Sequence, residues 1–171
     1  MKALGVLAGI ALALALQTTI ARFALAGGRV SVDLVLVAVV YVALTTGPVS
    51  GMLSGSAAGL IQDAVSSSSG IIGVGGLAKS IVGFLLGVIG QQFIMTAALP
   101  RLVMIIAATA VQAAVFMGLY AALGVRMFPA GWQAVAGQAL ANAVAGIVAF
   151  AIIEALPGMI ERRRMRRRAS R

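Results

Sequence analysis

The fold is decided by the stretch from Gly47 to Gly87, which reads GPVSGMLSGSAAGLIQDAVSSSSGIIGVGGLAKSIVGFLLG. On both sides of its serine-rich turn, small or ionisable residues recur every four positions. The two series are Gly51, Gly55, Gly59 and Asp63 before the turn, and Gly75, Lys79, Gly83 and Gly87 after it. Fourfold spacing places each series on one stripe of a helix, and small residues there let two helix backbones approach closely. The stretch therefore predicts two helices, at about 48–64 and 73–96.

Each glycine stripe permits two interpretations. The stripes pack neighbouring helices of this chain together, or at least one of them forms a docking groove for a helix of another protein. The ionisable residues suggest an ion pair between Asp63, near the end of the first helix, and Lys79, roughly 9 Å along the second. The alternative is that Lys79 extends its side chain to water or lipid headgroups without a partner.

The composition indicates an integral membrane protein. Hydrophobic residues make up 61% of the 171 residues and charged residues 10%, whereas soluble domains have roughly 45–50% and 25%. The chain contains no cysteine and no histidine, and its acids are Asp33, Asp63, Glu154 and Glu161. The usual zinc, haem and iron–sulfur sites and the Ser-His-Asp triad are therefore excluded. We expect neither a cofactor nor enzymatic activity.

Apolar runs predict an all-α polytopic protein with six transmembrane helices. They lie at about 3–21, 34–46, 48–64, 73–96, 101–124 and 132–156. Gly47-Pro48 separates the second helix from the third, and Pro157-Gly158 is expected to end the sixth. Residues 1–160 would form one transmembrane domain and residues 161–171 a basic cytoplasmic tail. The alternatives are a cleaved signal peptide ending near residue 26, and five spans with 34–64 as one bent element.

Basic residues predict the orientation. With both termini in the cytoplasm, Lys2, Arg101 and seven tail arginines lie inside, against Arg22, Arg29 and Arg126 outside. Nine against three agrees with the positive-inside rule. We expect the tail to bind anionic lipid headgroups through its run of six arginines: Arg162, Arg163, Arg164, Arg166, Arg167 and Arg168. No aromatic residue interrupts this run for base stacking, so we do not expect nucleic-acid binding.

Three amides lie within the last two predicted helices: Gln112, Gln138 and Asn142. Hydrogen bonds between helices account for them. The second interpretation is a polar pocket for a small molecule, to which all three would contribute.

The same stretch resembles the MreD family of rod shape-determining membrane proteins. The resemblance rests on Gly55, Gly59, Leu60, Gln62 and Asp63, then Gly73, Leu77, Lys79 and Gly83, and on the segment DLVLVAVVYVALTTGPVSG from Asp33. It implies a non-enzymatic scaffold or regulator of lateral peptidoglycan synthesis in the bacterial cytoplasmic (inner) membrane. The implied partner is an MreC-like protein with one transmembrane helix, in a complex with a RodA-like glycosyltransferase, a class B penicillin-binding protein and MreB filaments.

The resemblance also implies a fold similar to the six-helix substrate-binding subunits of energy-coupling-factor transporters. The alternative function is therefore a vitamin-like small-molecule binding subunit of such a transporter. A subunit of that kind needs several convergent polar groups in a pocket, for which Gln112, Gln138 and Asn142 are the candidates.

Overall fold

The computed structural model describes the backbone of residues 2–23, 32–65, 72–93, 97–124 and 131–169. The burial and contacts of side chains are described for part of these ranges. Over these residues the chain forms six helices. They are α1 (Lys2–Phe23), α2 (Leu34–Thr46), α3 (Pro48–Val65), α4 (Val74–Gln92), α5 (Ala98–Ala122) and α6 (Trp132–Ala169). The helical class agrees with the prediction, and the helix bounds agree to within about four residues, apart from the end of α6.

The break between α2 and α3 follows from two adjacent residues. Gly47 has φ +98°, a conformation that side chains disfavour, and its N–H donates to the carbonyl of Ala43 at 3.1 Å. Pro48 then begins α3, where a missing N–H costs nothing. The segment is therefore two helices, as predicted, and not one bent helix.

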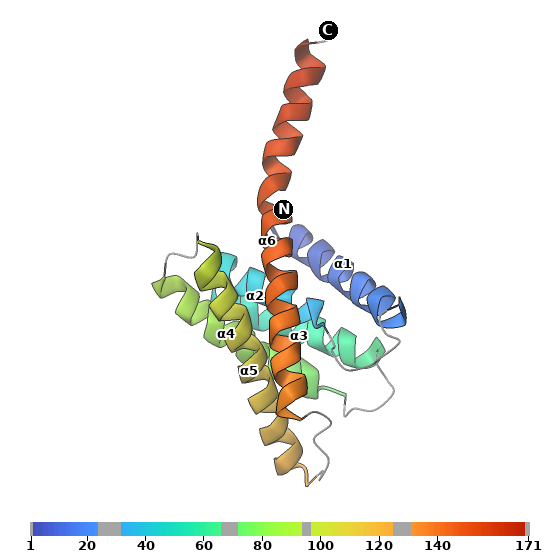
Figure 1. Ribbon diagram of the computed structural model, residues 1–171, viewed down its shortest axis with the longest axis vertical. Coiled ribbons are helices and arrows are strands. Elements are labelled where there is room, and N and C mark those ends of the chain that lie inside the picture. The colour runs from blue at the N-terminus through green and yellow to red at the C-terminus, as the bar shows by residue number, and fades with distance from the viewer. Residues whose placement is uncertain (1, 24–31, 66–71, 94–96, 125–130, 170–171) are drawn as a thin grey trace.

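The prediction that Pro157-Gly158 ends α6 is wrong, because the helix continues to Ala169. The residues that follow, MIERRRMRRRA, have high helix propensity apart from the isoleucine, so the helix persists beyond the proline. Figure 1 shows α6 extending past the other helices on the side of the bundle where α1 begins. Residues 161–169 of the expected tail are thus part of α6.

The shortest helix, α2, lies at the centre of the bundle and packs against each of the other five helices (Figure 1). Seven of its 13 residues are buried. One side joins a core with Val82 and Leu86 of α4, Ile105 of α5 and Phe150 of α6. Its other side packs through Val35 and Val39 on α1 and α3. A helix apolar on all sides is suited to this position.

Three helices are long and apolar enough to cross a membrane, counting only the residues whose structure is described. They are α4, α5 and residues 132–155 of α6. Residues 9–19 of α1 and the whole of α2 form shorter apolar segments. At 1.5 Å per residue, α2 is about 20 Å long and falls short of the roughly 30 Å hydrocarbon core. Six complete spans stay a prediction.

Candidate functional site

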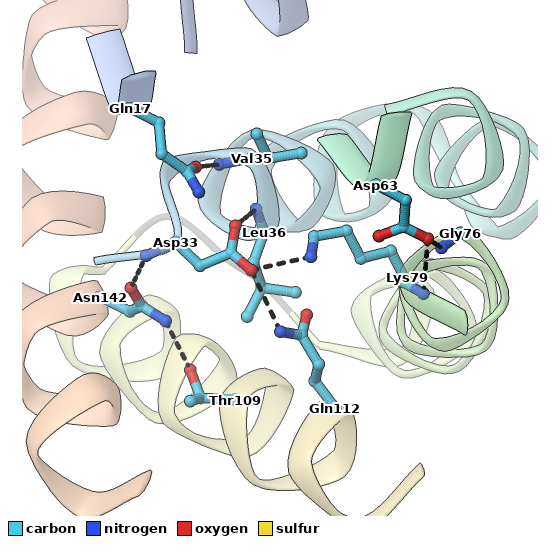
Figure 2. Close-up of polar contacts among 11 residues, drawn as sticks. Gln17, Asp33, Val35, Leu36, Asp63, Gly76, Lys79, Thr109, Gln112 and Asn142 are labelled. Carbon is cyan, nitrogen blue, oxygen red and sulfur yellow. Dashed lines mark hydrogen bonds and ion pairs between the residues drawn. The ribbon is translucent and has the colours of Figure 1, made fainter. Parts of the chain in front are cut away.

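The N-terminus of α2 is built around the buried side chain of Asp33. One carboxylate oxygen, Oδ1, accepts from the backbone N–H of Leu36 at 2.9 Å and so caps the helix. The other, Oδ2, lies 2.8 Å from the Lys79 ammonium of α4 and accepts from Nε2 of Gln112 on α5 at 3.1 Å. Figure 2 shows these side chains converging from three helices. The Asp33 carboxylate thus caps α2, forms an ion pair with Lys79 and accepts a hydrogen bond from the Gln112 amide.

The backbone N–H groups around Asp33 form hydrogen bonds with side chains of two further helices, α6 and α1. The Asp33 N–H donates to Oδ1 of Asn142 on α6 at 2.7 Å. Nδ2 of Asn142 in turn donates to Oγ1 of Thr109 at 3.1 Å. From α1, Oε1 of Gln17 accepts from the N–H of Val35 at 3.1 Å. We call Gln17, Asp33, Lys79, Thr109, Gln112 and Asn142 the Asp33 network; its members come from α1, α4, α5, α6 and the start of α2.

Part of the Asp33 network lies far from the ends of α5 and α6. Thr109 and Gln112 are near the middle of α5, and Asn142 is near the middle of the apolar part of α6. The side chains of Lys79 and Asp33 are only 3% and 6% exposed. Burying a lone charge is expensive, and burying a pair is tolerated when geometry and further hydrogen bonds compensate. The hydrogen bonds around Asp33 provide that compensation.

The predicted ion pair between Asp63 and Lys79 is wrong. Oδ2 of Asp63 accepts from the N–H groups of Gly73 and Gly75, each at 2.9 Å, and of Gly76 at 3.4 Å. These groups surround the start of α4, whose own N-cap residue, Gly73, has no side chain to offer. The carboxylate therefore caps α4 at the positive end of the helix dipole, while Lys79, more than a turn further along, reaches Asp33.

The two glycine stripes face each other along α3 and α4. A Cβ atom added to Gly51 would collide with the Gly83 carbonyl oxygen, and one added to Gly83 would collide with that of Gly51. One added to Gly55 would meet the backbone of Lys79, and one added to Gly87 would lie 2.6 Å from the nitrogen of Pro48. The matching pairs run in opposite directions along the chain, so the helices are antiparallel with backbones in contact.

The remaining stripe residues complete this contact. A Cβ at Gly59 would lie 2.6 Å from the Cα of Gly76, and the hydroxyls of Ser56 and Ser80 hydrogen-bond at 2.5 Å. All the predicted stripe glycines are buried: Gly51, Gly55, Gly59, Gly75, Gly83 and Gly87. The structure thus uses both stripes within the chain, which corresponds to the packing interpretation.

Of the three predicted amides, Gln112 and Asn142 meet at Asp33. Gln138, one turn before Asn142, is partly exposed and is not part of the Asp33 network. Asp33 itself had no predicted role in the site, although an aspartate directly before an apolar helix is a known capping signal. The short α2 is also apolar on all sides, and this is a second signal that its start lies among other helices.

A separate polar contact joins the first turn of α5 to the end of the apolar part of α6. Nη2 of Arg101 lies 2.6 Å from Oε1 of Glu154, and the guanidinium lies 5.0 Å from the ring centroid of Phe150. The Phe150 ring packs edge-on against Tyr41 of α2 at 4.9 Å. Glu154 therefore pairs with Arg101. The side chains of the tail arginines lie outside the described residues, so their binding to lipid stays a prediction.

The arrangement is suited to holding helices together. Asp33, Asp63 and Glu154, the acids whose side chains are described, each engage a cation or backbone N–H groups. Within the described residues, no group of three or more acids, histidines or cysteines is placed to hold a metal ion.

Comparison with known proteins identifies the family. No significant match is found among curated proteins or solved structures, so similarity to transporter subunits stays a prediction. The family described as rod shape-determining protein MreD matches residues 3–159, nearly the whole chain. The match spans the α3–α4 contact and all six members of the Asp33 network. The chain therefore belongs to the MreD family of rod shape-determining proteins.

Proposed function

We propose that this protein is a non-enzymatic scaffold or regulator of lateral peptidoglycan synthesis, and that it acts by binding an MreC-like partner in the cytoplasmic membrane. The observation that carries the proposal is the family match over residues 3–159. The pairing of the described acids with a cation or with backbone N–H groups of the protein supports it, because a hydrolase or transferase needs an acid or base placed to reach a substrate.

The contacts of Gln112 and Asn142 help to decide between the scaffold and the transporter function. A small-molecule site requires polar groups directed at the ligand. Here Nε2 of Gln112 binds Asp33, and both ends of the Asn142 amide bind protein groups. These contacts favour a structural role for the amides. We therefore place the scaffold function ahead of small-molecule binding.

Depletion of the protein in rod-shaped cells that depend on it tests the function. We expect cells to round or swell while vitamin uptake is unchanged, and the wild-type gene to restore shape. Normal shape with lost uptake of one nutrient would instead establish the transporter function. Expression of a Gly118→Leu variant in the depleted cells serves as a control and should also restore shape, because a Cβ atom added at this α5 position meets nothing within 4 Å.

Recovery of the protein in mild detergent tests the partner. We expect a bitopic MreC-like protein to co-purify, accompanied in the larger complex by the RodA-like glycosyltransferase and the class B penicillin-binding protein. MreB filaments are expected as a further member on the cytoplasmic side. Recovery of an ATPase module with a bound vitamin would contradict the proposal.

A further inference from the structure

The Asp33 network contains one buried hydrogen-bond acceptor that its protein neighbours do not satisfy. Gln112 is 7% exposed, and its Nε2 donates to Oδ2 of Asp33. Its carbonyl oxygen, Oε1, is buried and has no hydrogen-bond partner among the described residues. Leaving such an atom unpaired in the interior is unfavourable, so a hydrogen-bond donor is expected beside it.

The Lys79 ammonium, which lies beside Gln112, has more N–H donors than described acceptors. An ammonium carries three N–H groups, and among the described residues its partner is Oδ2 of Asp33. That same oxygen accepts from Gln112, so the two side chains are neighbours. Figure 2 shows the Gln112 oxygen on the side of the amide that faces Lys79.

The chemistry of these two groups defines what fits between them. The occupant must accept from an ammonium and donate to a carbonyl oxygen. A cation is repelled by Lys79, and an anion without a proton, such as chloride, cannot donate to Gln112. The nearby hydroxyl of Thr109 is already engaged, because it donates to the Ile105 carbonyl and accepts from Asn142. Water meets both requirements, and buried waters typically satisfy such polar groups.

We infer that the Asp33 network binds one internal water molecule, held between the Lys79 ammonium and Oε1 of Gln112. The water gives Lys79 a second partner and satisfies the amide oxygen. It accounts for a glutamine at position 112, where an apolar residue would leave the ammonium bound by Asp33 alone. The ion pair in the middle of the bundle is then locally hydrated although it is closed to bulk water.

The chain is well suited to a direct test, because its two lysines are Lys2 and Lys79. Protein labelled with ¹⁵N-lysine and reconstituted in bilayers gives two ammonium signals in solid-state NMR. We expect magnetisation selected on water protons to reach the Lys79 nitrogen at short mixing times. If only Lys2 receives it, the internal water is refuted.

Two variants locate the water. In Gln112→Leu the transfer to Lys79 should be lost while that to Lys2 is unchanged; undiminished transfer to Lys79 would overturn the assignment. Gln138→Leu, outside the Asp33 network on α6, should behave as wild type. Asn142, the single asparagine of the chain, reports by its side-chain shifts whether the network is intact. Should Gln112→Leu fail to fold, the wild-type transfer decides the question alone.

Discussion

The α3–α4 contact and the Asp33 network both hold helices together, but by opposite means. Between α3 and α4, the backbones touch at Gly51, Gly55 and Gly83, where no side chain separates them. In the Asp33 network, long side chains from several helices extend to the start of α2 and meet there. The first contact should be sensitive to added volume, whereas the second should be sensitive to an unpaired charge. The following substitutions separate volume from charge.

The largest loss is expected from Lys79→Met, which keeps much of the side-chain volume but removes the cation. The Asp33 carboxylate would remain buried without its partner, and breaking a buried pair costs roughly 3–5 kcal/mol. Thermal unfolding in detergent and abundance in the membrane measure the effect. Gln138→Met is the control on α6. Wild-type stability of Lys79→Met would show that the pair contributes little.

Gly55→Leu should come next, because its side chain would enter the Lys79 backbone. Overpacking typically costs roughly 1–3 kcal/mol, and more where a backbone must move. We expect reduced abundance and a lower unfolding temperature. Gly118→Leu adds the same residue to α5 at a position where an added Cβ atom meets nothing within 4 Å, and it should be tolerated. Equal effects at the two positions would contradict a close contact at Gly55.

Asp63→Ala should have a smaller effect, because it removes a helix cap and leaves the buried ion pair in place. Losing a capping side chain costs roughly 0.5–2 kcal/mol. Asp63→Asn keeps an acceptor for the N–H groups of Gly73 and Gly75 and should recover part of the loss. The unfolding temperatures of both variants provide the measurement. A loss of stability as large as that of Lys79→Met would mean that Asp63 takes part in the ion pairing of the Asp33 network.

The smallest effect is expected from Glu154→Gln. The Glu154 side chain is 53% exposed, and exposed ion pairs contribute little because water screens them. The Arg101 guanidinium also keeps its position over the Phe150 ring. Unfolding temperature should stay near the wild-type value at low and high salt. A marked drop in the unfolding temperature would show that the Arg101–Glu154 pair stabilises the packing of α5 against α6.

The contrast between the two regions also explains what could be predicted from the sequence. The α3–α4 contact repeats every four residues, so its periodicity marked one stripe on each helix, while leaving open whether the stripes meet each other or a partner protein. Gly47-Pro48 marked the start of α3 for a similarly local reason. Such patterns can be recognised from neighbouring residues alone, without knowledge of how the helices are arranged.

The Asp33 network has no such periodicity. Its residues are single positions, with hydrogen-bonded partners up to 109 residues apart, and their meeting depends on where α2 begins within the bundle. Sequence spacing instead paired Lys79 with Asp63, the acid nearest to it along the chain. It also ended α6 at Pro157, because the pattern of a proline next to a glycine does not include the helix-forming residues beyond it.

The partner of Lys79 is the central claim, and a pair of double-mutant cycles tests it most directly. One cycle combines Asp33→Asn with Lys79→Met, and the other combines Asp63→Asn with Lys79→Met, with unfolding free energy measured for each variant. In the Asp33 cycle, the double variant should be destabilised by clearly less than the sum of the single changes. In the Asp63 cycle, the effects should add to within about 0.5 kcal/mol. Coupling in the Asp63 cycle with additivity in the Asp33 cycle would contradict the account.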